Sequence, residues 1–241
     1  MAGRAPEGMD EATAVLFPDT FQESGPESLP KMWRASVLSA LSNLNARSWS
    51  AKNSPERISY LDLANVKDNE VAAVTEFAFD DAPSRARRIL QSGDTIVGTV
   101  RPGNRSFAFI HEPVLNLTGS TGFAVLTPKL SEYTAYVYLA AMQDESIEHL
   151  AHVADGGAYP AVRPDAVAAL PCVVPPSEVL RAFISVTCPL LESVSANQRQ
   201  VQTLTTLRDT LLPRLISGQL RLPTAETPPA VAPPARSPAP V

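Results

Sequence analysis

Apolar residues recur every seven positions in the carboxyl-terminal part of the chain, between Ser177 and Leu212, a stretch that contains no glycine. The repeat consists of Phe183, Leu190, Asn197, Leu204 and Leu211, with Val194 and Val201 at intervening positions. Heptads of this kind place side chains along one side of an α-helix, which we call the heptad seam. The pattern predicts a helix of about 35 residues, about 50 Å long, that closes near residues 216–218.

The heptad seam admits two interpretations. A helix of this length exceeds the width of the preceding body, so it would project as a coiled-coil helix and pair with a second helix. Asn197 would then set the register of the pair at some cost in stability. Alternatively, the helix packs back onto its own body. Thr187 and Arg208 interrupt the seam and Pro189 and Pro213 perturb its ends, but the sevenfold repeat favours pairing.

Short strand-like segments are interspersed with helical ones before this helix, in a body that spans residues 33–176. Alternating or β-branched residues predict strands at 96–100, 106–110, 122–126 and 172–174, with a Pro-Gly-Asn turn at 102–104. Helical spacing predicts helices at 35–44, 132–142 and 145–152, the last stopped by a glycine pair at 156–157. The body is therefore α+β or irregular α/β, with a mixed β-sheet and flanking helices.

Proline, glycine and acidic residues mark both ends of the chain. Residues 1–32 predict a linker-like arm whose one cohesive piece is 14–18, and Trp33 marks entry into the body. Residues 223–241 are rich in proline and predict a disordered tail, because such a segment cannot pack a core. The organisation is thus an arm at 1–32, a body at 33–176, a helix at 177–222 and a tail at 223–241.

The composition is that of a soluble globular protein, with 241 residues, 44% of them hydrophobic and 19% charged. No unbroken apolar run approaches the roughly 18 residues of a membrane span, and the amino terminus has no apolar signal region. We therefore expect a cytoplasmic protein that does not enter a membrane. Its two cysteines, Cys172 and Cys188, are expected to be reduced thiols.

The net charge of −5 is unevenly distributed. The acidic excess lies within residues 1–30, which leaves the rest of the chain neutral overall. Residues 85–105 form a local basic region in which Asp94 is the one acidic residue. Its arginines are Arg85, Arg87, Arg88, Arg101 and Arg105. A local basic surface of this kind is what contact with phosphates requires.

Two loops carry the side chains that read nucleic-acid bases. The predicted hairpin tip holds Arg101, Asn104 and Arg105, and a second loop holds Tyr159 and Arg163. Arginine and asparagine make bidentate contacts to guanine and adenine edges. The alternative is a set of solvated surface arginines beside turn glycines, which are common on proteins.

No arrangement of residues indicates catalysis. His149 and His152 are three positions apart, whereas a zinc-binding helix of the metalloprotease type spaces its histidines by four. Glycine-rich nucleotide loops are absent, and Gly119–Gly122 falls short of a hydrolase elbow, so it predicts a turn before a strand. We expect no catalytic residue and no bound metal or cofactor.

Three segments, in this order, resemble one family. Residues 93–102 (Gly-Asp-Thr-Ile-Val-Gly-Thr-Val-Arg-Pro) resemble a strand of its recognition domain, and residues 155–162 with 170–176 resemble that domain's loop and exit. Residues 211–221 resemble the end of its spacer helix. The family is the specificity (S) subunits of type I restriction–modification systems, and the resemblance covers about 33–222.

The resemblance implies a half-length form. Full-length members have two target recognition domains and two spacer helices, and this chain has one of each. Residues 1–4, 16–21 and 29–33 are similar to the linker before the second recognition domain. The chain would therefore form a homodimer or pair with a separate first half, so that two half-sites of a bipartite target are read.

The resemblance also implies partners and roles. Arg85, Arg87 and Arg88 would contact phosphates of double-stranded DNA, whereas Arg101, Asn104 and Arg105, with Tyr159 and Arg163, would lie near base edges. Methyltransferase (M) subunits that use S-adenosylmethionine and a motor/nuclease (R) subunit that uses ATP would bind the chain, which would itself hold neither cofactor. Two alternatives stay open: a coiled-coil interaction scaffold, and an inactive truncated remnant.

Overall fold

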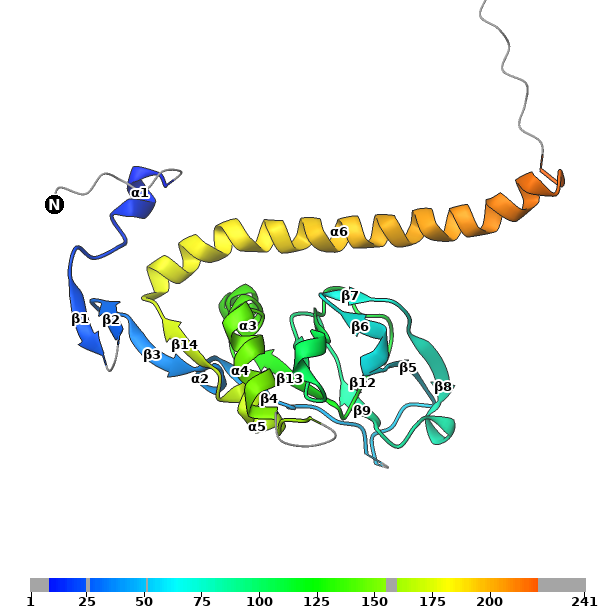
Figure 1. Ribbon diagram of the computed structural model, residues 1–241, viewed down its shortest axis with the longest axis horizontal. Helices are drawn as coiled ribbons and strands as arrows, with labels where there is room; N and C mark the ends of the chain where they lie inside the picture. The colour runs from blue at the N-terminus through cyan, green and yellow to red at the C-terminus, as the bar shows by residue number, and fades with distance from the viewer. Residues whose placement is uncertain (1–8, 25–26, 51, 155–159, 221–241) are drawn as a thin grey trace, which may run out of the picture. The chain divides into compact units, whose positions relative to one another are not determined.

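The computed structural model describes residues 9–24, 27–50, 52–154 and 160–220 (Figure 1). Tyr159, the predicted glycine stop at 156–157 and the tail at 223–241 lie outside the described residues. The chain divides into two compact units, Met1–Ala196 and Asn197–Val241. This division falls within the last helix, so the first unit holds all the strands of the described residues together with the beginning of that helix.

The first four-stranded sheet is built around the predicted hairpin. Its order is β11 (Phe107–Phe109), β10 (Thr95–Gly98), β13 (Phe123–Pro128) and β4 (Ser42–Leu44), and all neighbours are antiparallel. Ile96 lies opposite Ala108 on one side and Val125 on the other. The strands predicted at 96–100, 106–110 and 122–126 are therefore confirmed, as is the turn between the first two, which is the short helix η3 (Pro102–Asn104).

The central strands of this sheet are buried on both faces. Val97, Ala124 and Leu126 pack with residues of the helices on one face, whereas Ile96 and Phe123 pack into a second apolar cluster on the other. Successive side chains of a strand point to opposite faces. Burial on both faces therefore explains why these segments contain nearly continuous apolar residues rather than a clear alternation.

A second four-stranded sheet was not predicted from the sequence. Its order is β8 (Thr75–Ala78), β5 (Arg57–Leu61), β12 (Leu117–Ser120) and β9 (Ala86–Ile89). The pair β12–β5 is parallel, and the other pairs are antiparallel, so this sheet is mixed. Leu61 and Leu117 join Ile96 and Phe123 in the apolar cluster that connects the two sheets.

Helices cover the other face of the first sheet, as Figure 1 shows. They are α3 (Thr134–Ala141), α4 (Asp144–Ala154) and the short α5 (Pro164–Ala168). The helices predicted at 132–142 and 145–152 are thus confirmed. The remaining short elements are η1 (Leu63–Asn65), β6 (Val66–Lys67), β7 (Glu70–Val71), η2 (Phe79–Asp81) and η4 (Ser131–Tyr133).

The helix predicted at 35–44 is wrong. Residues there form β3 (Arg34–Val37), one helical turn α2 (Leu38–Leu41) and then β4. The strand β3 pairs antiparallel with β14 (Pro171–Val174), which confirms the last predicted strand. Leu38 and Leu41 are both buried and both lie in this single turn. Their spacing accounts for the helical pattern that the sequence suggested over ten residues.

The arm contains local structure of its own. Its elements are α1 (Glu11–Ala14), β1 (Phe21–Ser24) and β2 (Glu27–Pro30), and the two strands form an antiparallel hairpin. Asp10 accepts a hydrogen bond of 2.7 Å from the backbone N–H of Thr13, which caps α1. Phe17 and Trp33 have ring centroids 6.1 Å apart, so the arm is anchored at the entry to the body.

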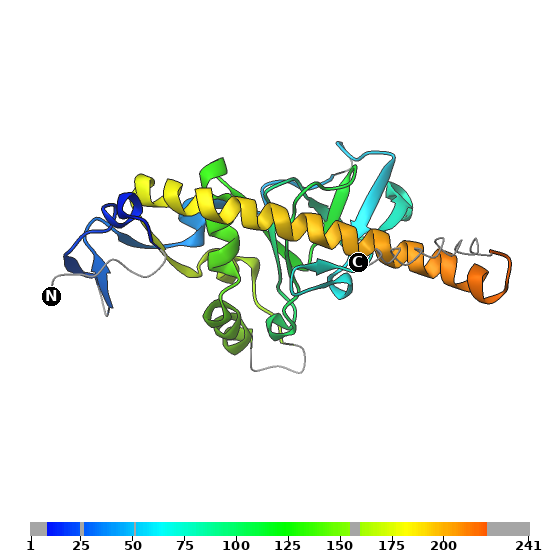
Figure 2. The ribbon, with the colours of Figure 1, turned by 90° about the horizontal axis from the view of Figure 1, so that it is seen from above.

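The predicted long helix is confirmed as α6 (Ser177–Ile216), continuous in both views of the ribbon (Figures 1 and 2). Of its residues, Val179 and Leu180 are buried, and the ring of Phe183 packs edge-on against Tyr136 at 5.8 Å. Further along, Leu190 is 60% exposed and Leu204 57% exposed. Gly218, at φ +71°, donates to the carbonyl of Leu215 and closes the helix where the sequence predicts.

By length and composition, α6 meets the criterion for a helix that could span a membrane, contrary to the expectation from the sequence. An 18-residue window of this helix reaches a mean hydropathy of 1.4, although charged residues interrupt its apolar runs. Core helices of soluble proteins and signal sequences meet the same criterion. Composition alone therefore does not choose between lipid and a second helix as the environment of α6, and the heptad spacing is what favours a second helix.

Both cysteines are free thiols. Burial raises the pKa of Cys172, in β14, to about 11, as its apolar strand predicts. Burial, followed by the charge of Glu192, raises the pKa of Cys188 on α6. Neither thiol is therefore activated for nucleophilic chemistry.

A buried carboxylate, Asp94, connects the two sheets. It is 1% exposed and accepts hydrogen bonds from Arg47 Nη2 at 2.9 and 3.0 Å, from Thr127 Oγ1 at 2.7 Å and from the Gln91 N–H at 2.8 Å. Arg47 follows β4 of the first sheet, and its carbonyl accepts from Ile89 of β9 in the second sheet. The ion pair thus fixes the segment that passes from one sheet to the other.

We predict that Asp94→Asn lowers the free energy of unfolding by about 3 kcal/mol, because it leaves the guanidinium of Arg47 without its charged partner in a largely buried site. Urea denaturation measures this change. Glu76→Gln is the matched control, since Glu76 and Arg57 form an exposed pair at 3.2 Å whose loss costs at most about 1 kcal/mol. Equal losses in the two variants would contradict a structural role for Asp94.

Candidate nucleic-acid interface

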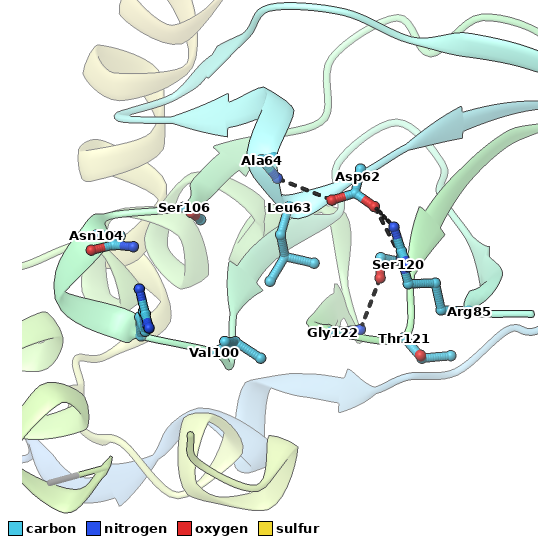
Figure 3. A pocket seen from close by; sticks show the side chains of 11 residues that line it. Asp62, Leu63, Ala64, Arg85, Val100, Asn104, Ser106, Ser120, Thr121 and Gly122 are labelled. Atoms are coloured by element: carbon cyan, nitrogen blue, oxygen red, sulfur yellow. Dashed lines mark hydrogen bonds and ion pairs between the residues drawn. The ribbon is translucent and has the colours of Figure 1, made fainter. Parts of the chain in front are cut away.

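A groove of about 630 Å³ lies where four connections of the first unit meet (Figure 3). Its walls come from the end of β5, the start of β9, the η3 turn and the turn between β12 and β13. Its lining includes Asp62, Leu63, Arg85, Val100, Arg101 and Asn104. Asn104 lies at one end of the groove and Arg85 at the other, with Leu63 and Val100 between them.

The η3 turn presents Arg101 and Asn104 from a constrained backbone. Arg101 has φ 47° and Arg105 has φ 60°, so both flanking residues adopt the left-handed conformation that L residues rarely occupy. Inside the turn, Asn104 donates its N–H to the Arg101 carbonyl at 2.8 Å and Pro102 is buried. The side chains of Arg101 and Asn104 are exposed at the groove.

The structure brings the second predicted loop beside this turn. The Arg101 N–H donates to the carbonyl of Pro160 at 2.8 Å, and the Val162 N–H donates to the carbonyl of Thr99 at 2.9 Å. Arg163 follows directly, exposed, at the residue before α5. Residues 99–101 and 160–162 therefore run together, although about 60 positions separate them in the sequence.

The residues that line the groove do not include Arg105. Its Nε donates to Asp68 Oδ1 at 2.5 Å, its Nη1 donates to Asp144 Oδ1 at 2.7 Å, and its guanidinium lies 5.2 Å from the centre of the Phe107 ring. Hydrogen bonds to these two carboxylates raise the pKa of Arg105. Arg105 thus ties the η3 turn to the β6–β7 connection and to the start of α4.

The predicted arginine cluster at 85–88 is divided by the strand that contains it. Arg87 lies 5.0 Å from the centre of the Phe79 ring, and Arg88 Nη1 donates to Ser48 Oγ at 3.2 Å. Both are half-buried, and burial lowers the pKa of Arg88. Arg85, just before β9, is the member of the cluster that lines the groove.

Arg85 belongs to a network that the sequence analysis missed. Its Nη2 donates to Asp62 Oδ2 at 2.6 Å, its Nε donates to the Tyr60 hydroxyl at 2.9 Å, and that hydroxyl donates to Asp62 Oδ2 at 2.7 Å. Burial works to raise the pKa of Asp62, but hydrogen bonds from Tyr60 and Arg85 outweigh it and hold the pKa below its usual value. Asp62 follows an apolar strand without a recognisable motif, so no local signal marks it.

Comparison with known proteins places the fold. No family model matches the chain. The HindI type I restriction enzyme specificity subunit of Haemophilus influenzae is 23% identical over 155 residues, which cover 63% of this chain and 34% of that protein. The MjaIX type I specificity subunit of Methanocaldococcus jannaschii is 42% identical over 50 residues, 21% of this chain and 12% of that protein.

Two solved structures extend the likeness to most of the chain. The HsdS subunit of Thermoanaerobacter tengcongensis matches with a TM-score of 0.56 and 25% identity, covering 85% of this chain and 54% of that one. A structure of a type I restriction–modification system matches with a TM-score of 0.52 and 23% identity, covering 85% and 53%. The chain is similar in sequence and in fold to type I specificity subunits.

The match covers only part of the length of each of these proteins. The chain spans about a third of the HindI subunit and about half of the HsdS subunit. The expected resemblance is therefore confirmed, together with the α+β fold followed by a long helix. The assignment of individual DNA-binding residues stays a prediction.

We predict that Arg101→Gly is more stable than Arg101→Ala by about 1 kcal/mol, because glycine adopts φ 47° without the Cβ clash. Thermal and urea unfolding of the two variants measure the difference. Arg163 provides the matched control, since it is exposed at φ −74° and there alanine should be the more stable replacement. The same order of stability at both positions would contradict strain at the η3 turn.

Proposed function

We propose that this chain is a DNA-sequence recognition subunit of a type I restriction–modification complex and has no catalytic role. The observation that carries the proposal is the groove lined by Arg85, Arg101 and Asn104 on a fold shared with HsdS subunits. Arg101 and Asn104 offer the donors and acceptors that read base edges in the major groove. Double-stranded DNA is the proposed ligand.

The proposed DNA contacts fall into two classes. Arg101 and Asn104, with Arg163 on the adjoining segment, act at base edges. Arg87 and Arg88 act near phosphates, although each already has an intramolecular contact that DNA would have to share or replace. Arg105 supports the turn from behind through its two carboxylate partners.

We propose that the heptad seam of α6 pairs with a second spacer helix, from another copy of this chain or from a separate first half. Further exposed apolar side chains flank the seam on its two sides. They include Val186, Leu207 and Leu212. Burying these side chains against an equivalent helix would hold two recognition domains at a fixed spacing, as reading a bipartite target requires.

The remaining parts of the complex are proposed from the relationship to specificity subunits. Methyltransferase subunits would supply S-adenosylmethionine and the methyl transfer, and a motor/nuclease subunit would supply ATP-driven cleavage. Both would act with this chain in the cytoplasm. A scaffold that binds only proteins is the competing function, and dependence on DNA distinguishes the two.

We predict that the full chain retains random-sequence duplex DNA at low salt and loses it steeply as salt rises. The logarithm of the binding constant should fall with a slope of about −0.9 per contacted phosphate, because bound counterions are released. Fluorescence anisotropy over a salt series measures the slope. Absence of binding at low salt would favour the protein-binding scaffold.

Fluorescence anisotropy titrations with variants test whether the groove reads DNA sequence. Replacing Arg101 and Asn104 by Ala should weaken binding to an enriched target by about 10-fold or more and binding to other sequences far less. Arg57→Ala is the control, because that exposed arginine lies outside the groove lining. Equal losses on all sequences would assign the turn to backbone contact.

We predict that Leu190→Lys with Leu204→Lys separates the paired helices and leaves the body folded, because lysine charges would have to be buried in the seam. The dissociation constant of the pair should rise by about 100-fold or more. Sedimentation equilibrium measures the mass, and circular dichroism checks folding. Ala196→Lys with Thr206→Lys, away from the seam, is the matched control, and a mass unchanged by the seam variants would contradict pairing.

A further inference from the structure

One arginine of the groove is held in a fixed orientation. Arg85 donates from Nε and Nη2 to Asp62 Oδ2 at 3.0 and 2.6 Å, and Nε also lies 2.9 Å from the Tyr60 hydroxyl. Tyr60 is itself 4% exposed, within the apolar cluster beneath the second sheet. A hydroxyl fixed by packing thus orients the carboxylate, and both orient the guanidinium.

The planar geometry of the guanidinium determines which N–H donors of Arg85 remain available to a ligand. A guanidinium has five N–H donors in one plane, arranged along two usable edges. The edge made by Nε and Nη2 is occupied by Asp62 and Tyr60. Among the hydrogen bonds of the described residues, none uses Nη1 of Arg85, so the terminal Nη1–Nη2 edge is available. The Arg85 side chain is 58% exposed, against 23% for Asp62, so the terminal edge is accessible.

The charge balance argues against a simple phosphate contact. Asp62 compensates the positive charge of Arg85, and the lowered pKa of Asp62 keeps that carboxylate ionised at neutral pH. A phosphate contact draws mainly on net positive charge and carries no sequence information, so an arginine whose charge is compensated is a weak choice for it. A pair of acceptors in a fixed plane depends instead on orientation, which this network supplies.

The exposed ion pair Arg57–Glu76 provides a comparison for the ion pair Arg85–Asp62. It has one hydrogen bond of 3.2 Å, and its two side chains are 61% and 71% exposed. Within the described residues, no buried group makes a further hydrogen bond to either side chain. The network around Arg85 is therefore more than an incidental surface ion pair, and it lies at the end of the groove opposite Asn104 (Figure 3).

We infer that Arg85 reads a guanine through its terminal edge, with Asp62 and Tyr60 as positioning residues. Guanine presents N7 and O6 as two acceptors in the plane of its major-groove edge, which matches the fork. This inference rests on the proposed DNA recognition and makes Arg85 a specificity-determining residue instead of a phosphate contact.

The test compares base preference with overall affinity. The full chain first selects a target from a random duplex library, and each guanine of that target is then replaced in competition binding. The variants are Arg85→Lys, which keeps the charge and removes the fork, and Asp62→Asn, which removes the charge that orients it. Arg57→Lys and Glu76→Gln are the matched controls on the exposed pair.

We expect one guanine whose replacement costs the unmodified chain roughly 5- to 150-fold in affinity. Arg85→Lys should reduce that preference below about 3-fold while binding to unrelated DNA stays within about 2-fold. Asp62→Asn should also reduce the preference, although loss of a negative charge beside DNA would by itself strengthen binding to every sequence. The controls should retain the preference.

Three results would overturn the inference. An equal loss of affinity for all sequences in Arg85→Lys would make Arg85 a phosphate contact. Uniformly tighter binding in Asp62→Asn, with the preference retained, would remove Asp62 as a positioning residue. Absence of any sequence preference in the unmodified chain would instead defeat the proposed function, and the inference with it. Thermal unfolding checks each fold, and Tyr60→Phe, which keeps the buried ring, replaces Asp62→Asn if that variant unfolds.

Discussion

The ion pair between Arg47 and Asp94 is the interaction on which the body depends. Asp94 is buried at the start of β10, and its oxygens also accept from Thr127 on β13 and from the backbone of Gln91. Arg47 reaches it from the segment that leaves β4 and runs along β9. A buried carboxylate is tolerated only when it is fully hydrogen-bonded and paired, so these elements can meet in few other ways. The ion pair thereby fixes the position of one sheet, and with it the walls of the groove, relative to the other sheet.

The arginines of this body serve mainly to hold its loops in place. Most arginines of residues 85–105 are already engaged with the protein itself: Arg105 with Asp68 and Asp144, Arg88 with Ser48, and Arg85 with Asp62. Local charge is therefore used to fix loops and to orient donors more than to raise a positive potential. The proposed recognition depends correspondingly on geometry, which discriminates between bases, and less on net charge, which attracts any phosphate backbone.

Sequence analysis recovered the elements whose signal is local. The hairpin around η3, the strand β13, the helices α3 and α4 and the long helix α6 follow from periodicity and turn residues within short windows. The second sheet was missed because its strands are short and β9 carries two consecutive arginines, Arg87 and Arg88. The helix predicted at 35–44 failed for a related reason: pairing of β3 with β14, more than 130 residues away, overrides a local helical spacing.

The sequence by itself determined the heptad seam, the hairpin that carries Arg101 and Asn104, and the likeness to type I specificity subunits, because each is written in residues close together along the chain. Only the tertiary structure decided which arginines face a common groove and which are held by carboxylates. Asp62, Tyr60 and Arg85 become one network through the pairing of β5, β12 and β9. Backbone hydrogen bonds of the residues just before Arg163 bring it beside the η3 turn. Such contacts depend on chain crossings between distant segments, and no short stretch of sequence encodes them.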